Sequence, residues 1–375
     1  MTRYFPIGIL CFLFGSFSLV SAQTGETGST TNTPKYSNEF LRIGVGARAF
    51  GMGNAQVAAA NDVTAGYWNP AGLASPGTVP YPEVSLMHAS YFAGIADYSY
   101  IGFTMPVDSA SDKYFGVSVI RMGIDDIPNT LQLIDPDGSF NYSRVTSFSE
   151  TQLAALVSYA WQPVLIEGLN LGFNVKIIYR GVGRFANAWG FGVDLGARYQ
   201  RGPLSLAAVL TDATHTYNAW TFNTETFAEE FAATGNIVPT SSVELTRPAL
   251  RVGLAYDISL ARKAKLLLAL DSDVYFDGRR PGSVAFIGNA SVDPRLGAEF
   301  ALLNQQYRKV AFLRGGVYNI QNILDSEGNP VTGLFPTIGV GVVLRNFTLD
   351  YALANIGNLS ENLHTHIVSL KFHIQ

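Results

Sequence analysis

Cysteine is almost absent from this sequence, which limits the chemistry that the chain can perform. Cys11 is the only one and lies in the apolar stretch Tyr4–Val20, which follows a basic start and precedes the small residues Val20-Ser21-Ala22. This pattern is typical of a cleaved signal peptide over residues 1–22, with an uncleaved anchor as the alternative. The mature chain would begin at Gln23 without cysteine, which excludes disulfides, thiolate zinc sites and cysteine nucleophiles.

Charge is also scarce. Charged residues make up 14% of the 375 residues, against 47% hydrophobic and 12% aromatic residues. Soluble domains carry about 25% charged residues, so this composition favours a surface that faces lipid. The formal net charge of -4 is mild, and we expect no nucleic-acid partner.

Long apolar runs are missing after the signal peptide. The densest stretches, Leu153–Trp161 and Leu266–Leu270, are far shorter than the roughly 20 residues of a transmembrane helix. An exported chain of this kind can span a membrane only as a closed β-barrel.

Alternating hydrophobicity supports such a barrel. In Leu169–Arg180 and Trp189–Tyr199, apolar residues occupy one face and Gly, Asn, Asp, Lys or Arg the other, with aromatic residues near the ends of the apolar face. Lipid outside and a polar lumen inside produce this pattern. A water-soluble β-sandwich also alternates, but with more charge between such segments.

The alternating segments number about fourteen. We predict strands at 83–90, 97–105, 113–121, 147–161, 169–181, 186–200, 203–210, 248–257, 265–276, 293–302, 310–318, 335–345, 347–354 and 365–373. Short connections alternate with connections that are mostly long. This is the pattern expected when periplasmic turns alternate with extracellular loops. The sequence therefore predicts an all-β fold, a transmembrane antiparallel β-barrel over residues 81–375. A flexible periplasmic lead over 23–39 and an N-terminal plug over 40–80 precede it.

The region before the first strand contains the most specific motif. It reads Gly44-Val-Gly46-Ala-Arg48-Ala-Phe-Gly51-Met-Gly53, and later Tyr67-Trp68-Asn69-Pro70-Ala71-Gly72-Leu73. Glycine permits close backbone approach at Gly46, Gly51 and Gly53. Arg48 could pair with a lumenal carboxylate, Asp194, Asp257 or Glu299, and Asn69-Pro70 predicts a turn. Gating of a ligand path is the alternative to structural plugging.

This string resembles the N-terminal plug of the FadL-like barrels, and more closely that of the PorV/PorQ family of type IX secretion. Gly123-Ile-Asp125-Asp126-Ile127-Pro128-Asn129 is a second match. The resemblance implies a fourteen-stranded outer-membrane barrel with the plug in its lumen. It also implies a component that binds secreted cargo by its C-terminal domain and shuttles it from the translocon to a surface attachment complex.

Two extracellular loops are the expected contact surfaces, Gly123–Thr146 and Asp212–Arg247. Candidate partner- or ligand-binding residues are Ile127, Pro128, Asn129, Tyr217, Trp220, Phe222, Phe227 and Phe231. Exposed aromatic residues favour a protein-binding face, although they could instead fold inward as a lid. The competing function is FadL-like uptake of hydrophobic small molecules, with the same aromatic residues lining a pocket.

No motif indicates an enzyme or a cofactor. The glycine cluster lacks the Gly-Lys-Ser/Thr ending of a phosphate loop. His364 and His366 lie on one face of a predicted strand but lack a nearby third metal ligand. We therefore assign no catalytic or metal site, and expect outer-membrane lipid, the type IX translocon and attachment proteins, and secreted cargo as partners.

Overall fold

The computed structural model describes residues 36–374, except 76–80, 92–93, 108–111, 136, 227–240, 325–327 and 356–363. The predicted signal peptide, most of the predicted lead, Phe227 and Phe231 lie outside the described residues. No helix within them is long and apolar enough to cross a membrane.

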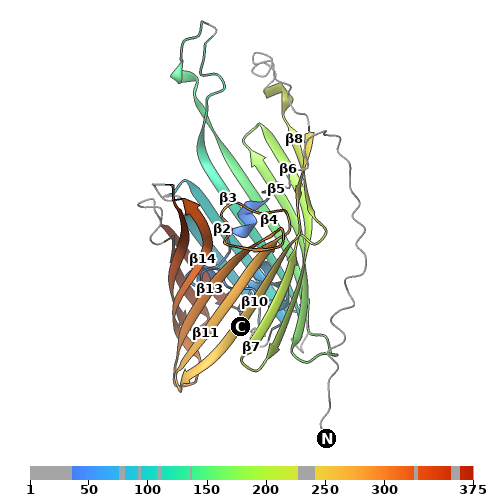
Figure 1. Ribbon diagram of the computed structural model, residues 1–375, viewed down its shortest axis with the longest axis vertical. Coiled ribbons are helices and arrows are strands. Elements are labelled where there is room, and N and C mark those ends of the chain that lie inside the picture. The colour runs from blue at the N-terminus through green and yellow to red at the C-terminus, as the bar shows by residue number, and fades with distance from the viewer. Residues whose placement is uncertain are drawn as a thin grey trace. The chain divides into compact units, whose positions relative to one another are not determined.

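The strands form one antiparallel sheet that closes on itself (Figure 1). The first strand, β1 (Glu83–Tyr91), pairs with both β2 and β17, which completes the ring. The remaining strands are β2 (Ala96–Pro106), β3 (Lys113–Asn129), β4 (Thr146–Trp161), β5 (Leu169–Val182), β6 (Ala186–Arg201), β7 (Leu204–Thr211), β8 (Thr216–Phe222), β9 (Ser241–Thr246), β10 (Ala249–Ala261), β11 (Ala264–Tyr275), β12 (Ala285–Ile287), β13 (Ala290–Leu303), β14 (Lys309–Leu324), β15 (Pro330–Leu344), β16 (Phe347–Ala354) and β17 (Thr365–His373).

The described strands fill fourteen positions in the barrel wall. Strand β8 pairs with the first residues of β6, whereas β7 pairs with the last residues of β6, so β7 and β8 occupy one wall position. Strands β9 and β10 likewise follow one another, and β12 is a three-residue addition to β13. The predicted fourteen-stranded antiparallel barrel is confirmed.

Side chains alternate across the wall as the lipid-facing pattern predicts. On β6, Asp194 and Arg198 are buried on the lumenal side, while Leu195 between them is 49% exposed on the outside. Outward aromatic rings lie in contact near both ends of the strands, with Tyr159 beside Phe173 at one end and Tyr179 beside Trp189 at the other. Interfacial aromatic residues of this kind are typical of membrane barrels.

One side of the barrel is taller than the rest. Strand β3 continues to Asn129, although its pairing with β2 ends at Ile124, and Figure 1 shows β3, β4, β6 and β8 rising together. Ile127, Pro128 and Asn129 therefore lie on β3, and Tyr217, Trp220 and Phe222 lie on β8, not in loops as predicted.

The loop prediction was wrong at these positions for an identifiable reason. A bulge at 125–126 shifts the register of β3 against β4, and Asp212 and His215 adopt left-handed backbone conformations before β8. Both features interrupt the alternation in the sequence. Beyond them, large apolar side chains such as Phe148, Trp220 and Phe222 occupy inward positions beside polar ones such as Asn218.

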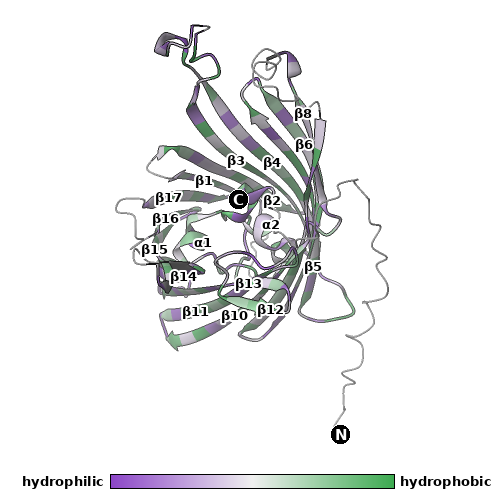
Figure 2. Cartoon of the chain, turned by 45° about the horizontal axis from the view of Figure 1, so that its top comes forward, coloured by the Kyte–Doolittle hydropathy of each residue, from purple (hydrophilic) through white to green (hydrophobic). Residues whose placement is uncertain are grey.

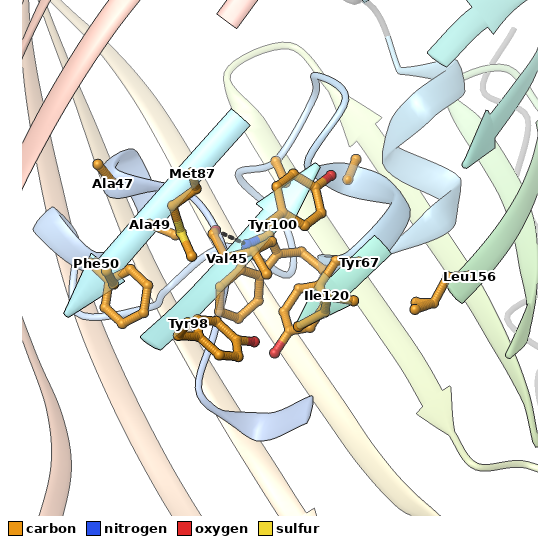
Figure 3. Close-up of a cluster of buried hydrophobic side chains, with 14 of the residues drawn as sticks. Val45, Ala47, Ala49, Phe50, Tyr67, Met87, Tyr98, Tyr100, Ile120 and Leu156 are labelled. Atoms are coloured by element: carbon orange, nitrogen blue, oxygen red, sulfur yellow. Dashed lines mark hydrogen bonds between the residues drawn. The ribbon is translucent and has the colours of Figure 1, made fainter. Parts of the chain in front are cut away.

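Residues 36–75 lie inside the ring of strands, and we call them the inner segment (Figure 2). It contains η1 (Glu39–Arg42), α1 (Ala47–Gly51), α2 (Ala65–Trp68) and η2 (Pro70–Ala74). Val45, Phe50 and Tyr67 of this segment form a buried cluster with wall residues such as Tyr98 and Ile120 (Figure 3). The cluster holds the segment against β1 to β4.

The inner segment has little regular structure, so its backbone groups need partners from the wall. The amide nitrogens of Ala47 and Val57 donate to Ser369 Oγ and Asp271 Oδ2, both at 2.7 Å. Ser37, which we expected in the flexible lead, is buried and accepts a hydrogen bond from Thr246 at 2.7 Å. Polar lumenal side chains thus replace water around this segment.

Candidate functional site

Arg48 joins the inner segment to the wall through an ion pair. Its Nε donates to Glu299 Oε2 at 2.8 Å, so the structure selects Glu299 among the three carboxylates considered from the sequence. Glu299 also accepts from Arg314 Nε at 2.8 Å, and Arg314 Nη1 donates to Asp350 at 2.7 Å. Lys309 Nζ lies 3.8 Å from Glu299 Oε1 at the exposed edge, so three cations and two carboxylates form a largely buried network.

A second ion pair lies beside this network, since Arg48, Asp62, Asp350 and Lys371 line one small pocket. Lys371 Nζ is 2.7 Å from Asp62 Oδ2. Burial raises the pKa of the Asp62 carboxyl, but the cations of Lys371 and Arg48 outweigh that effect and hold its pKa well below the usual range. Asp62 is therefore ionised at neutral pH, and its pairing favours the inserted position of the inner segment.

Two of the predicted plug glycines, Gly51 and Gly53, lie where backbones meet. A Cβ on Gly53 would lie 2.6 Å from Val317 N and 2.7 Å from Leu296 O, and φ at Gly53 is +58°. A Cβ on Gly51 would lie 2.9 Å from Gly339 Cα, and Gly46 has a φ of +90°. Larger side chains would push the inner segment away from β13 to β15.

Asn69, Pro70 and Gly72 fix the last turn of the inner segment. Asn69 Oδ1 accepts from Ala71 N at 3.1 Å and so caps η2, while its Nδ2 donates to Ala197 O of β6 at 3.2 Å. A Cβ on Gly72 would lie 2.5 Å from Ala60 O. Asn69 and Pro70 thus lie against β6, whereas Gly72 packs within the inner segment.

An apolar cleft of about 550 Å³ opens on the inner face of the taller wall. We call it the mouth cleft. Phe148 and Phe185 meet edge to face with ring centroids 4.9 Å apart, and Trp220 stacks on Phe222 at 6.3 Å. The lining residues are Pro128, Asn129, Thr130, Leu131, Phe148, Val182, Phe185, Ala186, Trp220, Phe222 and Ser242.

Charged groups hold the aromatic side of the cleft in place. Trp220 Nε1 donates to Glu244 Oε2 at 2.8 Å, and Glu244 pairs with Arg180 at 3.0 Å. The Arg180 guanidinium lies 4.9 Å from the centre of the Trp220 ring. The indole N–H is thereby satisfied, which leaves the cleft an apolar aromatic surface.

The structure brings together only part of the predicted binding set. Pro128, Asn129, Trp220 and Phe222 line the cleft, whereas Tyr217 is 55% exposed on the opposite face of β8. Ile127 faces Phe148 across the β3–β4 pair.

Phe148, Val182 and Phe185 also line the cleft, and our sequence reasoning missed them. The sequence feature that could have predicted them is an apolar residue at an inward-facing position near the end of a strand, as at Phe148 and Val182.

The described residues contain no group of three or more His, Cys, Asp or Glu side chains placed to hold a metal ion. His366 Nδ1 lies 2.7 Å from the Tyr351 hydroxyl, and His364 Nδ1 lies 3.4 Å from Asn355 O.

Comparison with solved structures agrees with this architecture. The chain is similar to the toluene transporter TbuX of Ralstonia pickettii (TM-score 0.51, 15% identity, 88% of this chain and 99% of that one). It is also similar to the monoaromatic hydrocarbon channel CymD (TM-score 0.54, 12% identity, 89% and 98%) and the toluene transporter TodX of P. putida (TM-score 0.52, 13% identity, 88% and 99%). The fold is that of the FadL-like barrels.

At these identities the likeness establishes the fold and not the activity. No protein-family model and no curated protein matches the sequence. The finer resemblance to the PorV/PorQ family has no support from a sequence match, so it stays a prediction.

Proposed function

We propose that this chain is an outer-membrane barrel that takes up hydrophobic small molecules, which it first binds in the mouth cleft. The observation that carries the proposal is the cleft itself, about 550 Å³ in volume and lined by four aromatic rings. Its volume lies within the range of small-ligand pockets, about 300–1,000 Å³. Transport of toluene and monoaromatic hydrocarbons by proteins of the same fold supports this assignment.

Binding would be driven by burial of apolar ligand surface, which contributes about 25 cal/mol per Å². The indole N–H of Trp220 can bind a ligand only if its hydrogen bond to Glu244 breaks. The cleft therefore favours ligands without strong hydrogen-bond acceptors. Below the cleft, the inner segment occupies the lumen, and the contacts of Gly53 and Arg48 seat it against the wall. Passage through the barrel would require part of that segment to move.

Binding can be tested with protein in lipid nanodiscs and the fluorescent probe N-phenyl-1-naphthylamine. Wild type should bind the probe, and the double variant Trp220→Ser with Phe222→Ser should bind at least tenfold more weakly. Tyr217→Ser is the matched control, because Tyr217 lies on the same strand but on the opposite face. Equal affinity of all three proteins would overturn the proposal.

A second candidate function is the one implied by the PorV/PorQ resemblance, a type IX secretion component that binds cargo C-terminal domains. Exposed apolar side chains on the β3–β4 connection favour it: Ile134, Phe140 and Tyr142 are 62%, 65% and 75% exposed. Such patches often mark protein-binding sites. Replacing Phe140 and Tyr142 with Ser should release signal-bearing cargo from the surface if this candidate is right, and leave probe binding intact.

A further inference from the structure

A second cavity, about 320 Å³ in volume, lies between the start of the inner segment and the mouth ends of β11, β13 and β14. No residue that lines it also lines the mouth cleft. Its volume falls at the lower end of the range for small-ligand pockets. The lining is rich in tyrosine, arginine and amide side chains, in contrast to the apolar cleft.

Tyrosine rings form the flat surfaces of this cavity. The Tyr275 ring has two guanidinium groups over it, those of Arg280 at 3.8 Å and Arg42 at 4.5 Å. Arg280 also lies 5.0 Å from the Tyr36 ring centre. These cation–π contacts fix the ring positions. The guanidinium groups cover the Tyr275 ring, which is 5% exposed. The rings left to attract the weakly positive C–H groups of a ligand are those of Tyr36, which is 56% exposed, and Tyr318.

The arginines of this cavity are already neutralised. Arg280 pairs with Asp277 at 2.8 Å, Arg42 pairs with Glu39 at 2.9 Å, and Arg295 pairs with Asp273. An anionic ligand would have to compete with these carboxylates for the same cations. The cavity therefore offers many hydrogen-bond donors and acceptors but little net charge.

Hydrogen-bonding capacity remains at Arg295. Its side chain is 9% exposed, and its Nη1 has no hydrogen-bond partner among the described residues. A buried donor left without a partner costs free energy, so an oxygen acceptor there would be favourable. Ser283, Asn319 and Gln321 add further donors and acceptors to the lining.

We propose that this cavity binds a neutral saccharide of one or two rings. A sugar ring combines C–H faces, which stack on tyrosine, with hydroxyl groups at its edge that both donate and accept hydrogen bonds. It carries no charge to compete with the paired carboxylates. This site goes beyond hydrophobic uptake and is separate from the mouth cleft.

Saturation-transfer NMR on the full chain in nanodiscs tests the proposal, with glucose, galactose, N-acetylglucosamine and maltose as probes and benzoate as an anionic comparison. At least one sugar should receive saturation at its ring C–H protons. Ser283→Trp, which adds bulk to the cavity lining, should reduce that signal at least fivefold. Phe286→Ser, a neighbour on β12 outside the lining, should leave it unchanged.

Signals from none of the four sugars, or equal signals in wild type and Ser283→Trp, would overturn the saccharide site. Transfer to benzoate alone would also overturn it, in favour of an anionic ligand. Thermal unfolding of both variants checks that they fold. Probe binding at the mouth cleft should be the same in Ser283→Trp as in wild type, so the two proposals can fail independently.

Discussion

Arg48 and Glu299, 251 positions apart in the chain, form two hydrogen bonds across the lumen, Nε to Oε2 at 2.8 Å and Nη2 to Oε1 at 3.2 Å. The paired geometry fixes both the distance and the orientation of the inner segment relative to β13. Because Glu299 also accepts from Arg314, loss of this carboxylate would leave Arg48 without its ion-pair partner and Arg314 with Asp350 alone.

The first prediction concerns this network. Glu299→Gln should lower the free energy of unfolding by about 3–5 kcal/mol, because it leaves buried cations without their partner. Urea unfolding in lipid vesicles measures the change. Adding Arg48→Met to Glu299→Gln should recover part of the loss, since it removes one unpaired charge. A cost below about 1 kcal/mol would contradict this prediction, because breaking a buried ion pair costs several times more.

The second prediction separates backbone strain from steric contact. Gly53 and Gly202 have nearly the same φ, +58° and +59°, but only Gly53 would place a Cβ against the wall backbone, whereas a Cβ on Gly202 would meet nothing within 4 Å. Gly202→Ala should cost about 1–2 kcal/mol through its left-handed conformation alone. Gly53→Ala should cost clearly more in the same unfolding assay. Equal costs would mean that the inner segment shifts freely.

The fold was largely predictable because lipid imposes a simple rule on each wall strand. Asp194 and Leu195 differ only by one position in the sequence, yet alternation assigned them correctly to lumen and lipid. The partner of Arg48 could not be chosen among three carboxylates, since that choice depends on the register of β13 and the turns of the inner segment. Trp220 and Phe222 were identified as candidate binding residues but were predicted to lie in a loop. The alternation of lipid-facing apolar and lumenal polar residues applies only within the membrane, so it did not reveal a strand above it.

The third prediction tests where the membrane ends. Leu195 on β6 and Val243 on β9 are both exposed on strands, at 49% and 69%. Leu195→Arg should cost about 2–4 kcal/mol if it faces the middle of the bilayer. Val243→Arg should cost little, because β9 continues past the pairing of β10 with β11 on the taller side. Unfolding in vesicles compares the two, and a similar cost at both sites would contradict the assigned boundary.

The last prediction tests the function of the mouth cleft in cells. Trp220→Ser with Phe222→Ser removes two of the four aromatic rings of the cleft, and aromatic anchors usually dominate such binding sites. Uptake of labelled toluene by cells that depend on this barrel should fall at least fivefold, while Tyr217→Ser cells should match wild type.

Secretion and surface attachment of cargo with a type IX signal should be unchanged in both strains, and the amount of folded barrel should be equal by heat-modifiable gel mobility. Intact uptake with cargo released into the medium would reverse the assignment, because the cleft would then recognise protein. Since Tyr217 and Trp220 lie on one strand and differ in the face they occupy, a difference between these two variants locates the function on the inner face of the wall.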